Sequence, residues 1–190
     1  MLTTSHFIGL KIKSDILVDL YLWLQDIVQD DPSMIEFQNI LSAHVTLYYL
    51  PAVLSAEILE SIRDLITTAN IALPVWNIEW LDYFHEENAP RICFLLPSPR
   101  EELEKLHREF KTTFVEFADM SENSYPIFVP HITLFKVKNV EKFLKKKPVI
   151  ESLMQEKISR FRGENVFEDI KIYRVNSRFQ PEIQIPLTQS

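Results

Sequence analysis

Glycine, cysteine and long apolar runs are scarce in this sequence, and each absence excludes a class of protein. Only 2 of the 190 residues are glycine, so the chain has no glycine-rich loop to hold a phosphate with backbone amides. The single cysteine, Cys93, lies in the apolar run 92–96, which predicts a buried thiol and excludes a disulfide framework within the chain. No apolar run approaches the roughly 20 residues of a membrane-spanning helix. We therefore expect a cytoplasmic protein that does not insert into membranes.

Basic residues are also fewer than acidic residues. The chain carries 20 Lys and Arg against 27 Asp and Glu, a net charge of −7. A protein of this charge is unsuited to coating long DNA or RNA, which attract basic surfaces. The composition remains compatible with a small nucleotide or a single RNA end held in a local basic pocket. Hydrophobic residues make up 46% of the chain, enough for a globular domain with a substantial core.

One short pattern occurs twice in the chain. The sequence His-Val-Thr-Leu-Tyr starts at His44, and His-Ile-Thr-Leu-Phe starts at His131. Successive side chains of a strand point to opposite faces, so each His shares a face with the Thr two residues later. A polar His-x-Thr edge on an otherwise apolar strand predicts a site, and we expect both edges to meet over one phosphate. The plainer interpretation is a hydrogen-bonded, partly buried His–Thr pair in each strand.

Tyr48 and Phe135 occupy the same position after the two His–Thr pairs. By strict alternation they lie on the same face as those pairs. Two interpretations of the aromatic rings are open, since they either stack on a base or sugar or pack in the core beneath the site.

The surroundings of the two patterns are also repeated. Each half of the chain has the order strand, helix, His–Thr strand, helix, strand, and the repeat restarts near residue 89. This order indicates a single domain over residues 1–190 with two pseudo-symmetric halves, about 1–88 and 89–190. We expect each half to form one lobe, with the two His–Thr strands between the lobes.

Lysines gather after the second pattern, in a predicted helix from Val140 to Lys147 that Pro148 ends before a further helix over 150–158. The lysines either attract a phosphate chain or form a solvated helix face. The remaining histidines have plainer interpretations: His6 at the edge of a strand, His85 in a polar turn, and His107 on the surface of a helix.

Two histidines on either side of a phosphorus atom are suited to general acid–base catalysis. The unperturbed pKa of histidine is about 6.5, so near neutral pH one imidazole can accept a proton while the other donates one. Thr46 and Thr133 can hydrogen-bond the non-bridging phosphate oxygens. This scheme needs no metal or other cofactor. Two alternatives use the same residues: a site that binds a nucleotide without turnover, and a metal site of two histidines completed by an acid.

With these two motifs the chain resembles the 2H phosphoesterase superfamily, which includes 2′-5′ RNA ligase-like proteins and 2′,3′-cyclic nucleotide phosphodiesterases. The resemblance extends over nearly the whole chain. It implies a bilobal α+β fold, in which two antiparallel sheets flank a central cleft with helices outside. It also implies that His44 and His131 are the general acid and base, that Thr46 and Thr133 bind phosphate, and that no metal is required.

From the residues and the resemblance together, we expect a monomeric phosphodiesterase. Its substrate is a short RNA or nucleotide with a 2′,3′-cyclic phosphate or a 2′-5′ phosphodiester. Ligation through a 2′-5′ bond is an alternative, because both directions pass through the same transition state.

Overall fold

The computed structural model describes residues 6–13, 15–50, 54–69, 71–85, 87–115, 127–160, 163, 165–175 and 181–187. In this part of the chain the α-helices are α1 (Asp15–Val28), α2 (Ala56–Ala69), α3 (Arg100–Thr113) and α4 (Val140–Arg160). A short 3-10 helix, η1 (Ile40–Ser42), comes just before the first His–Thr strand. None of the described helices is long and apolar enough to cross a membrane.

The described strands form one hydrogen-bonded series, and every strand pairing is antiparallel. The strands are β1 (His6–Lys11), β2 (Ile35–Phe37), β3 (His44–Leu50), β4 (Val75–Phe84), β5 (Ile92–Ser98), β6 (Ile132–Val137), β7 (Asn165–Val166), β8 (Asp169–Val175) and β9 (Pro181–Leu187). Their order is β7-β4-β5-β6-β3-β1-β8-β9, with β2 also paired to β6. The expected α+β fold with antiparallel strands is confirmed.

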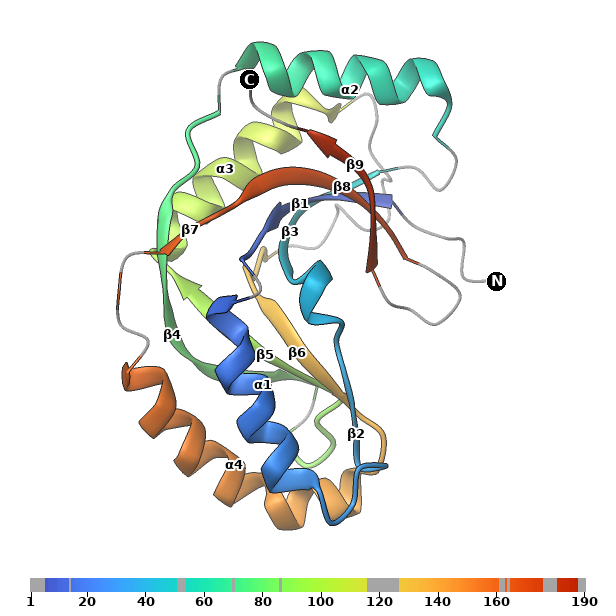
Figure 1. Ribbon diagram of the computed structural model, residues 1–190. Helices are drawn as coiled ribbons and strands as arrows, with labels where there is room; N and C mark the ends of the chain where they lie inside the picture. The colour runs from blue at the N-terminus through green and yellow to red at the C-terminus, as the bar shows by residue number, and fades with distance from the viewer. Residues whose placement is uncertain are drawn as a thin grey trace.

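The series divides into two lobes at its centre. β3 and β6 pair through one residue pair only, Val45 with Ile132. We call β1, β3, β8 and β9 the first lobe, and β2, β4, β5, β6 and β7 the second lobe. Figure 1 shows the first lobe above the second, with α2 and α3 in the upper part of the molecule and α1 and α4 in the lower part.

The two halves of the sequence do not each form one lobe, which corrects our expectation. β4 belongs to the first half of the chain but pairs with β5 in the second lobe. β8 belongs to the second half but pairs with β1 in the first lobe. The repeated units therefore exchange their last strands, and each lobe contains strands from both halves.

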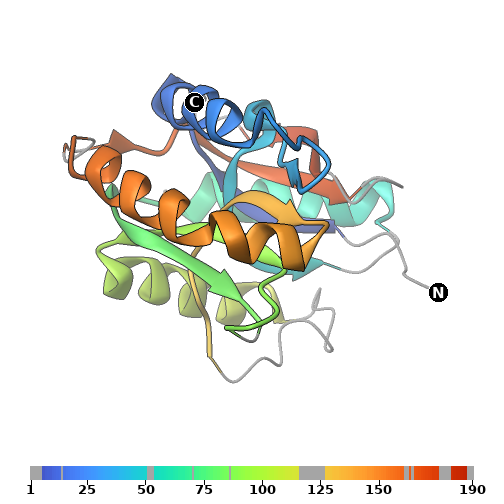
Figure 2. The same cartoon turned by 90° about the horizontal axis from the view of Figure 1, so that it is seen from below.

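The helices are exchanged in the same way. α1 follows a strand of the first lobe, yet its Tyr21 hydroxyl donates a hydrogen bond to the Leu134 carbonyl of the second lobe, over 3.1 Å. α3 follows a strand of the second lobe, yet His107 Nδ1 lies 2.7 Å from the Leu47 carbonyl of the first lobe. In Figure 2, which views the molecule from below, α4 runs across the front of the second lobe, in contact with α1 and β4.

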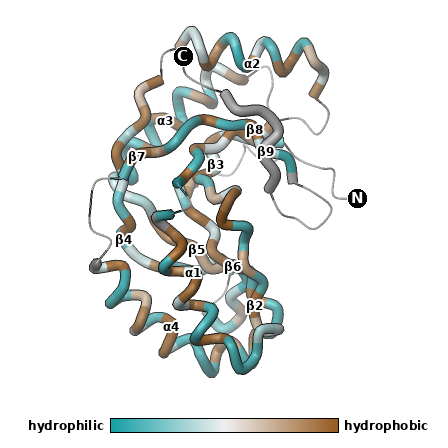
Figure 3. Tube along the Cα trace, in the orientation of Figure 1, coloured by the Kyte–Doolittle hydropathy of each residue, from teal (hydrophilic) through white to brown (hydrophobic). Residues whose placement is uncertain are grey.

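α4 runs unbroken through Pro148, where the sequence predicted a break. Its buried residues Phe143, Ile150, Met154 and Ile158 keep helical spacing on both sides of the proline, and Figure 3 shows the mixed hydropathy along the helix. A proline inside a helix removes one hydrogen bond and leaves a carbonyl free. Pro148 is exposed, so water can reach the helix there, while the continuous apolar stripe holds both parts of α4 against the core.

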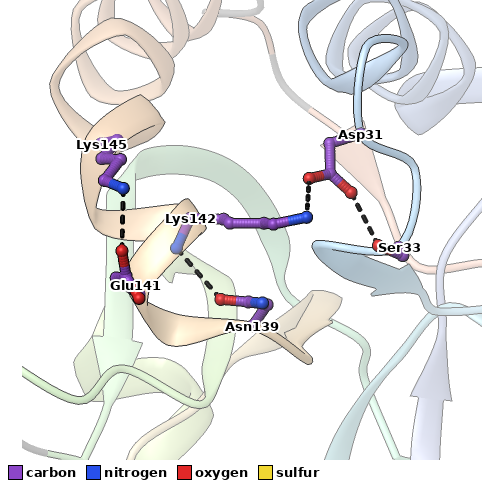
Figure 4. Close-up of polar contacts among 6 residues, drawn as sticks. All are labelled: Asp31, Ser33, Asn139, Glu141, Lys142 and Lys145. Atoms are coloured by element: carbon purple, nitrogen blue, oxygen red, sulfur yellow. Dashed lines mark hydrogen bonds and ion pairs between the residues drawn. The ribbon is translucent and has the colours of Figure 1, made fainter.

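The lysines of α4 are engaged with nearby carboxylates. Lys142 Nζ lies 2.5 Å from Asp31 Oδ2, and Lys145 Nζ lies 2.8 Å from Glu141 Oε1. The Lys142 backbone amide also donates to Asn139 Oδ1 at the start of the helix, as Figure 4 shows. These contacts favour the solvated helix face over a phosphate-attracting patch, and they fix the start of α4 to the turn after α1.

Candidate active site

The two His–Thr pairs meet where the lobes join. Because Val45 pairs with Ile132 in an antiparallel ladder, His44 lies opposite Thr133 and Thr46 lies opposite His131. Val45 and Ile132 are fully buried, and the residues on either side of them point to the other face. The structure thus places all four predicted residues on one face of the junction, and each of the four is partly exposed.

A β-bulge follows each Thr and ends the alternation that the sequence suggested. On β3, Thr46 pairs with Gly9 and Tyr48 with the preceding residue Ile8, so Leu47 is extra. On β6, Thr133 pairs with Phe94 and Phe135 with Cys93, so Leu134 is extra. Each bulge reverses which face the following residues occupy.

Tyr48 and Phe135 are therefore not on the site face, and the prediction that they share it is wrong. Tyr48 is 1% exposed and Phe135 is fully buried. The Tyr48 hydroxyl donates a hydrogen bond to the Phe114 carbonyl, over 2.9 Å. By the shifted registers, Tyr49 and Lys136 fall on that face of their strands instead.

Both histidines are held in the same orientation. His44 Nδ1 lies 2.7 Å from the Ser42 carbonyl, and His131 Nδ1 lies 2.8 Å from the Val129 carbonyl, in each case two residues earlier in the chain. A carbonyl only accepts hydrogen bonds, so Nδ1 of each ring is the donor and carries hydrogen. In the neutral ring Nε2 is then the basic nitrogen, available to receive or return a proton.

Aromatic rings pack against each imidazole and shield much of it from water. The His44 ring lies 4.7 Å from Phe7 and 4.6 Å from Tyr173, between ring centroids. The His131 ring lies 4.7 Å from Phe84 and 5.4 Å from Phe94. This burial lowers the pKa of both histidines, that of His44 to about 4, because the charged form loses more hydration than the neutral form.

A cavity of about 520 Å³ lies beside the junction. β3 contributes Thr46 and Tyr49 to its lining, and His131, the residue just before β6, also lines it. The rest of the lining is mostly apolar: Leu47, Phe84, His85, Ile92, His107, Ile127, Phe128 and Val129. Thr46 and His131 therefore border a mostly apolar, aromatic-lined space that residues from both lobes form.

His107 lines the cavity, a position that the sequence did not predict. We expected it on the surface, but it is half-buried. Its ring stacks on Phe128 at 4.1 Å between centroids and 2° between planes, and burial lowers its pKa. The helical spacing that links Leu103, Leu106 and Phe110 also places residue 107 at the edge of the buried stripe, and this signal could have found it.

The other polar candidates show no arrangement of their own among the described residues. Cys93 is buried and unbonded to another cysteine, as predicted. His85 is exposed at the rim of the cavity, with a φ of 79°. Within the described residues, no group of three or more His, Cys, Asp and Glu side chains is arranged to hold a metal ion.

Comparison with known proteins gives a family match and several similar structures. Residues 25–167 match the sequence profile of the 2′-5′ RNA ligase superfamily. TT0787 of Thermus thermophilus has a TM-score of 0.66 at 14% identity, over 97% of both chains. E. coli LigT complexed with 3′-AMP has a TM-score of 0.57 at 16% identity, over 97% of this chain and 95% of LigT. These structural likenesses show the fold alone, and no curated protein sequence matches the chain.

Proposed function

The chain belongs to the 2′-5′ RNA ligase superfamily, and on this premise we propose that it is a cytoplasmic, metal-independent phosphodiesterase. Its substrate is a 2′,3′-cyclic phosphate or a 2′-5′ phosphodiester on a short RNA or nucleotide. One observation carries this proposal: the β3–β6 pairing places two histidines and two threonines on one face, with Nδ1 of each histidine held by a carbonyl.

The proposed reaction uses the four residues as two matched pairs. A phosphate between the lobes places its non-bridging oxygens against the hydroxyls of Thr46 and Thr133, which stabilise the charge that grows on them. One histidine accepts a proton from the attacking water through Nε2, and the other donates a proton to the leaving ribose oxygen. The aromatic surroundings strengthen these interactions by excluding water.

The cavity provides the place for the nucleoside. Its lining includes Tyr49 and Phe128, and aromatic rings stack on bases of any sequence. The solved LigT structure with 3′-AMP supports a nucleotide as the ligand class. A base in this cavity would hold the attached phosphate beside Thr46 and His131.

The proposal is tested with a panel of substrates in the presence of a chelator. The panel contains the four 2′,3′-cyclic nucleotides, 2′-5′-linked dinucleotides, and 3′-5′-linked dinucleotides as controls. We expect turnover of at least one of the first two classes, with the 3′-5′ controls intact. Tight binding without turnover across the panel would instead indicate the alternative, a site that binds a nucleotide without catalysis.

Ligation remains a second function to test, because the family is named for it. Both directions share one pentavalent transition state, so the same four residues serve either. Incubation of RNA halves with 2′,3′-cyclic and 5′-hydroxyl ends, followed by digestion specific for 3′-5′ bonds, would detect a 2′-5′ product.

A further inference from the structure

The two lobes share the same strand register around the site, but the residue beside each histidine differs between them. In the first lobe Leu10 pairs with Val45 and Lys11 with His44. In the second lobe Leu95 pairs with Ile132, which places Leu96 beside His131. The first histidine thus has a lysine as its cross-strand neighbour, where the second has a leucine.

Lys11 is held firmly in this position. It is 5% exposed, and its Nζ donates to the Ile12 carbonyl over 3.0 Å and to the Leu41 carbonyl over 2.6 Å. Leu41 directly precedes Ser42, whose carbonyl accepts the hydrogen of His44 Nδ1. Lys11 therefore contacts the short segment that orients His44 and is also the cross-strand neighbour of His44.

The charged groups around His44 come from three strands. Lys11 faces it from β1 and His131 from β6, and both charges disfavour a proton on His44. From β8, Tyr173 contacts the His44 ring, and Asp169 lies opposite Lys11 with Lys171 Nζ 3.9 Å away. Burial lowers the pKa of the Lys11 amine, and the nearby charge of Glu168 partly offsets this by favouring the protonated form. Among the residues that the structure describes, the charged groups that act on His44 are His131 and Lys11.

We propose that Lys11 is a positioning residue that assigns the two histidines their roles, making His44 the general base and leaving His131 as the general acid. This inference rests on the proposed function. A base must be unprotonated when the substrate binds, and a neighbouring cation enforces that state. His131 has an apolar neighbour in the same place, and the negative phosphate favours its protonated form.

The resulting step is balanced for a 2′,3′-cyclic phosphate. The water oxygen forms a bond to phosphorus while one phosphorus–ribose oxygen bond breaks. The water proton passes to His44 Nε2, and the proton of His131 Nε2 passes to the leaving ribose oxygen. The product is a nucleoside monophosphate, and both histidines regain their starting states by exchange with solvent.

A change of leaving group tests the two roles. A p-nitrophenyl phosphodiester of the same nucleoside loses p-nitrophenolate, which leaves without a proton and needs no acid. We expect His131→Ala to slow cleavage of the cyclic phosphate by about 10²–10⁴-fold, but to slow the p-nitrophenyl ester far less. His44→Ala should slow both substrates to a similar extent. Rescue of His44→Ala by the p-nitrophenyl ester, with none for His131→Ala, would overturn the assignment.

A titration of the histidines tests the part played by Lys11. NMR titration of the imidazole signals should show the His44 midpoint at higher pH in Lys11→Met than in the wild type. Lys11→Arg keeps the charge and should leave the midpoint near the wild-type value, and Leu96→Met is the matched control in the second lobe. An unmoved His44 midpoint in a folded Lys11→Met protein would refute the proposal.

The two experiments separate this inference from the proposed function. If the wild type cleaves neither substrate, the proposed function fails, and the titration still decides whether Lys11 acts on His44. If Lys11→Met does not fold, Leu96→Lys provides the reciprocal test. The new cation should then move the His131 midpoint to lower pH, and an unchanged midpoint would contradict the electrostatic argument.

Discussion

At the scale of single residues, the two histidines His44 and His131 matter most, and each is partly buried. Nδ1 of each ring donates a hydrogen bond to a backbone carbonyl, and aromatic side chains pack against each ring. The hydrogen bond to the carbonyl favours the charged imidazole, but the loss of hydration disfavours it more strongly. The pKa of each histidine is therefore lowered. These residues therefore make the stability of the fold depend on pH.

We predict that the free energy of unfolding decreases as pH falls from about 6.5 towards 4. His44 has a pKa near 6.5 in the unfolded chain and about 4 in the folded protein. Between these values the unfolded state binds more protons, so acid favours unfolding, while above pH 6.5 the stability is fully present. Urea unfolding measured at several pH values checks this. His44→Phe should show a shallower dependence, and an unchanged slope would contradict the prediction.

Gly9 is a further residue whose lack of a side chain affects the packing around the site. A Cβ at this position would lie 3.1 Å from both Tyr173 Cε2 and the Val45 carbonyl oxygen, and the Tyr173 ring packs on His44. We predict that Gly9→Ala lowers the free energy of unfolding by about 1–3 kcal/mol and also reduces turnover.

The other glycine of the chain supplies the control. A Cβ on Gly163 would meet nothing within 4 Å, so Gly163→Ala should leave turnover unchanged. Paired urea titrations and rate assays would show the difference. Equal effects of the two substitutions would mean that the close approach of Tyr173 to Gly9 does not matter.

At the scale of elements, the two bulges decide which side chains reach the site. The spacing of His and Thr is a local property of each strand and could be predicted from the sequence. The bulges at Leu47 and Leu134 arise from pairing with β1 and β5, and no local pattern marks them. Alternation therefore placed Tyr48 and Phe135 on the wrong face, where the structure has Tyr49 and Lys136.

Adjacent tyrosines on β3 give a matched pair of variants. Tyr49→Ala should raise KM for a nucleotide, because stacking on an aromatic ring contributes roughly 1–3 kcal/mol per base. Tyr48→Phe should leave KM unchanged but lower stability by about 0.5–1.5 kcal/mol, because the hydrogen bond to the Phe114 carbonyl is lost. Steady-state kinetics and urea unfolding distinguish the two. A higher KM in Tyr48→Phe alone would mean that Tyr48, and not Tyr49, contacts the nucleotide, which would contradict this placement of the two rings.

At the scale of the whole molecule, the exchange of strands joins the two halves of the chain. The repeated order of elements was readable in the sequence because each element has its own periodicity. Which strand pairs with which depends on contacts between distant residues, such as β8 with β1, and the repeat alone left this open. The two His–Thr strands have matching registers with β1 and β5, while the predicted separation into two lobes by halves is wrong.

We predict that neither half folds alone. In residues 1–88, β1 would lack β8 and β4 would lack β5, which leaves buried strand edges unpaired. The fragments 1–88 and 89–190 should each show poorly dispersed NMR spectra, and refolding them together should restore dispersion. A well-dispersed spectrum from one isolated fragment would show that the lobes do not depend on the exchange.

The central claim is that His44 and His131 act on one phosphate. Its most direct test is the rate of cleavage of a 2′,3′-cyclic nucleotide by the wild type, His44→Ala and His131→Ala, each in chelator. We predict that each single variant loses about 10²–10⁴-fold in turnover while its unfolding remains cooperative. Turnover near the wild-type rate in either folded variant would contradict it.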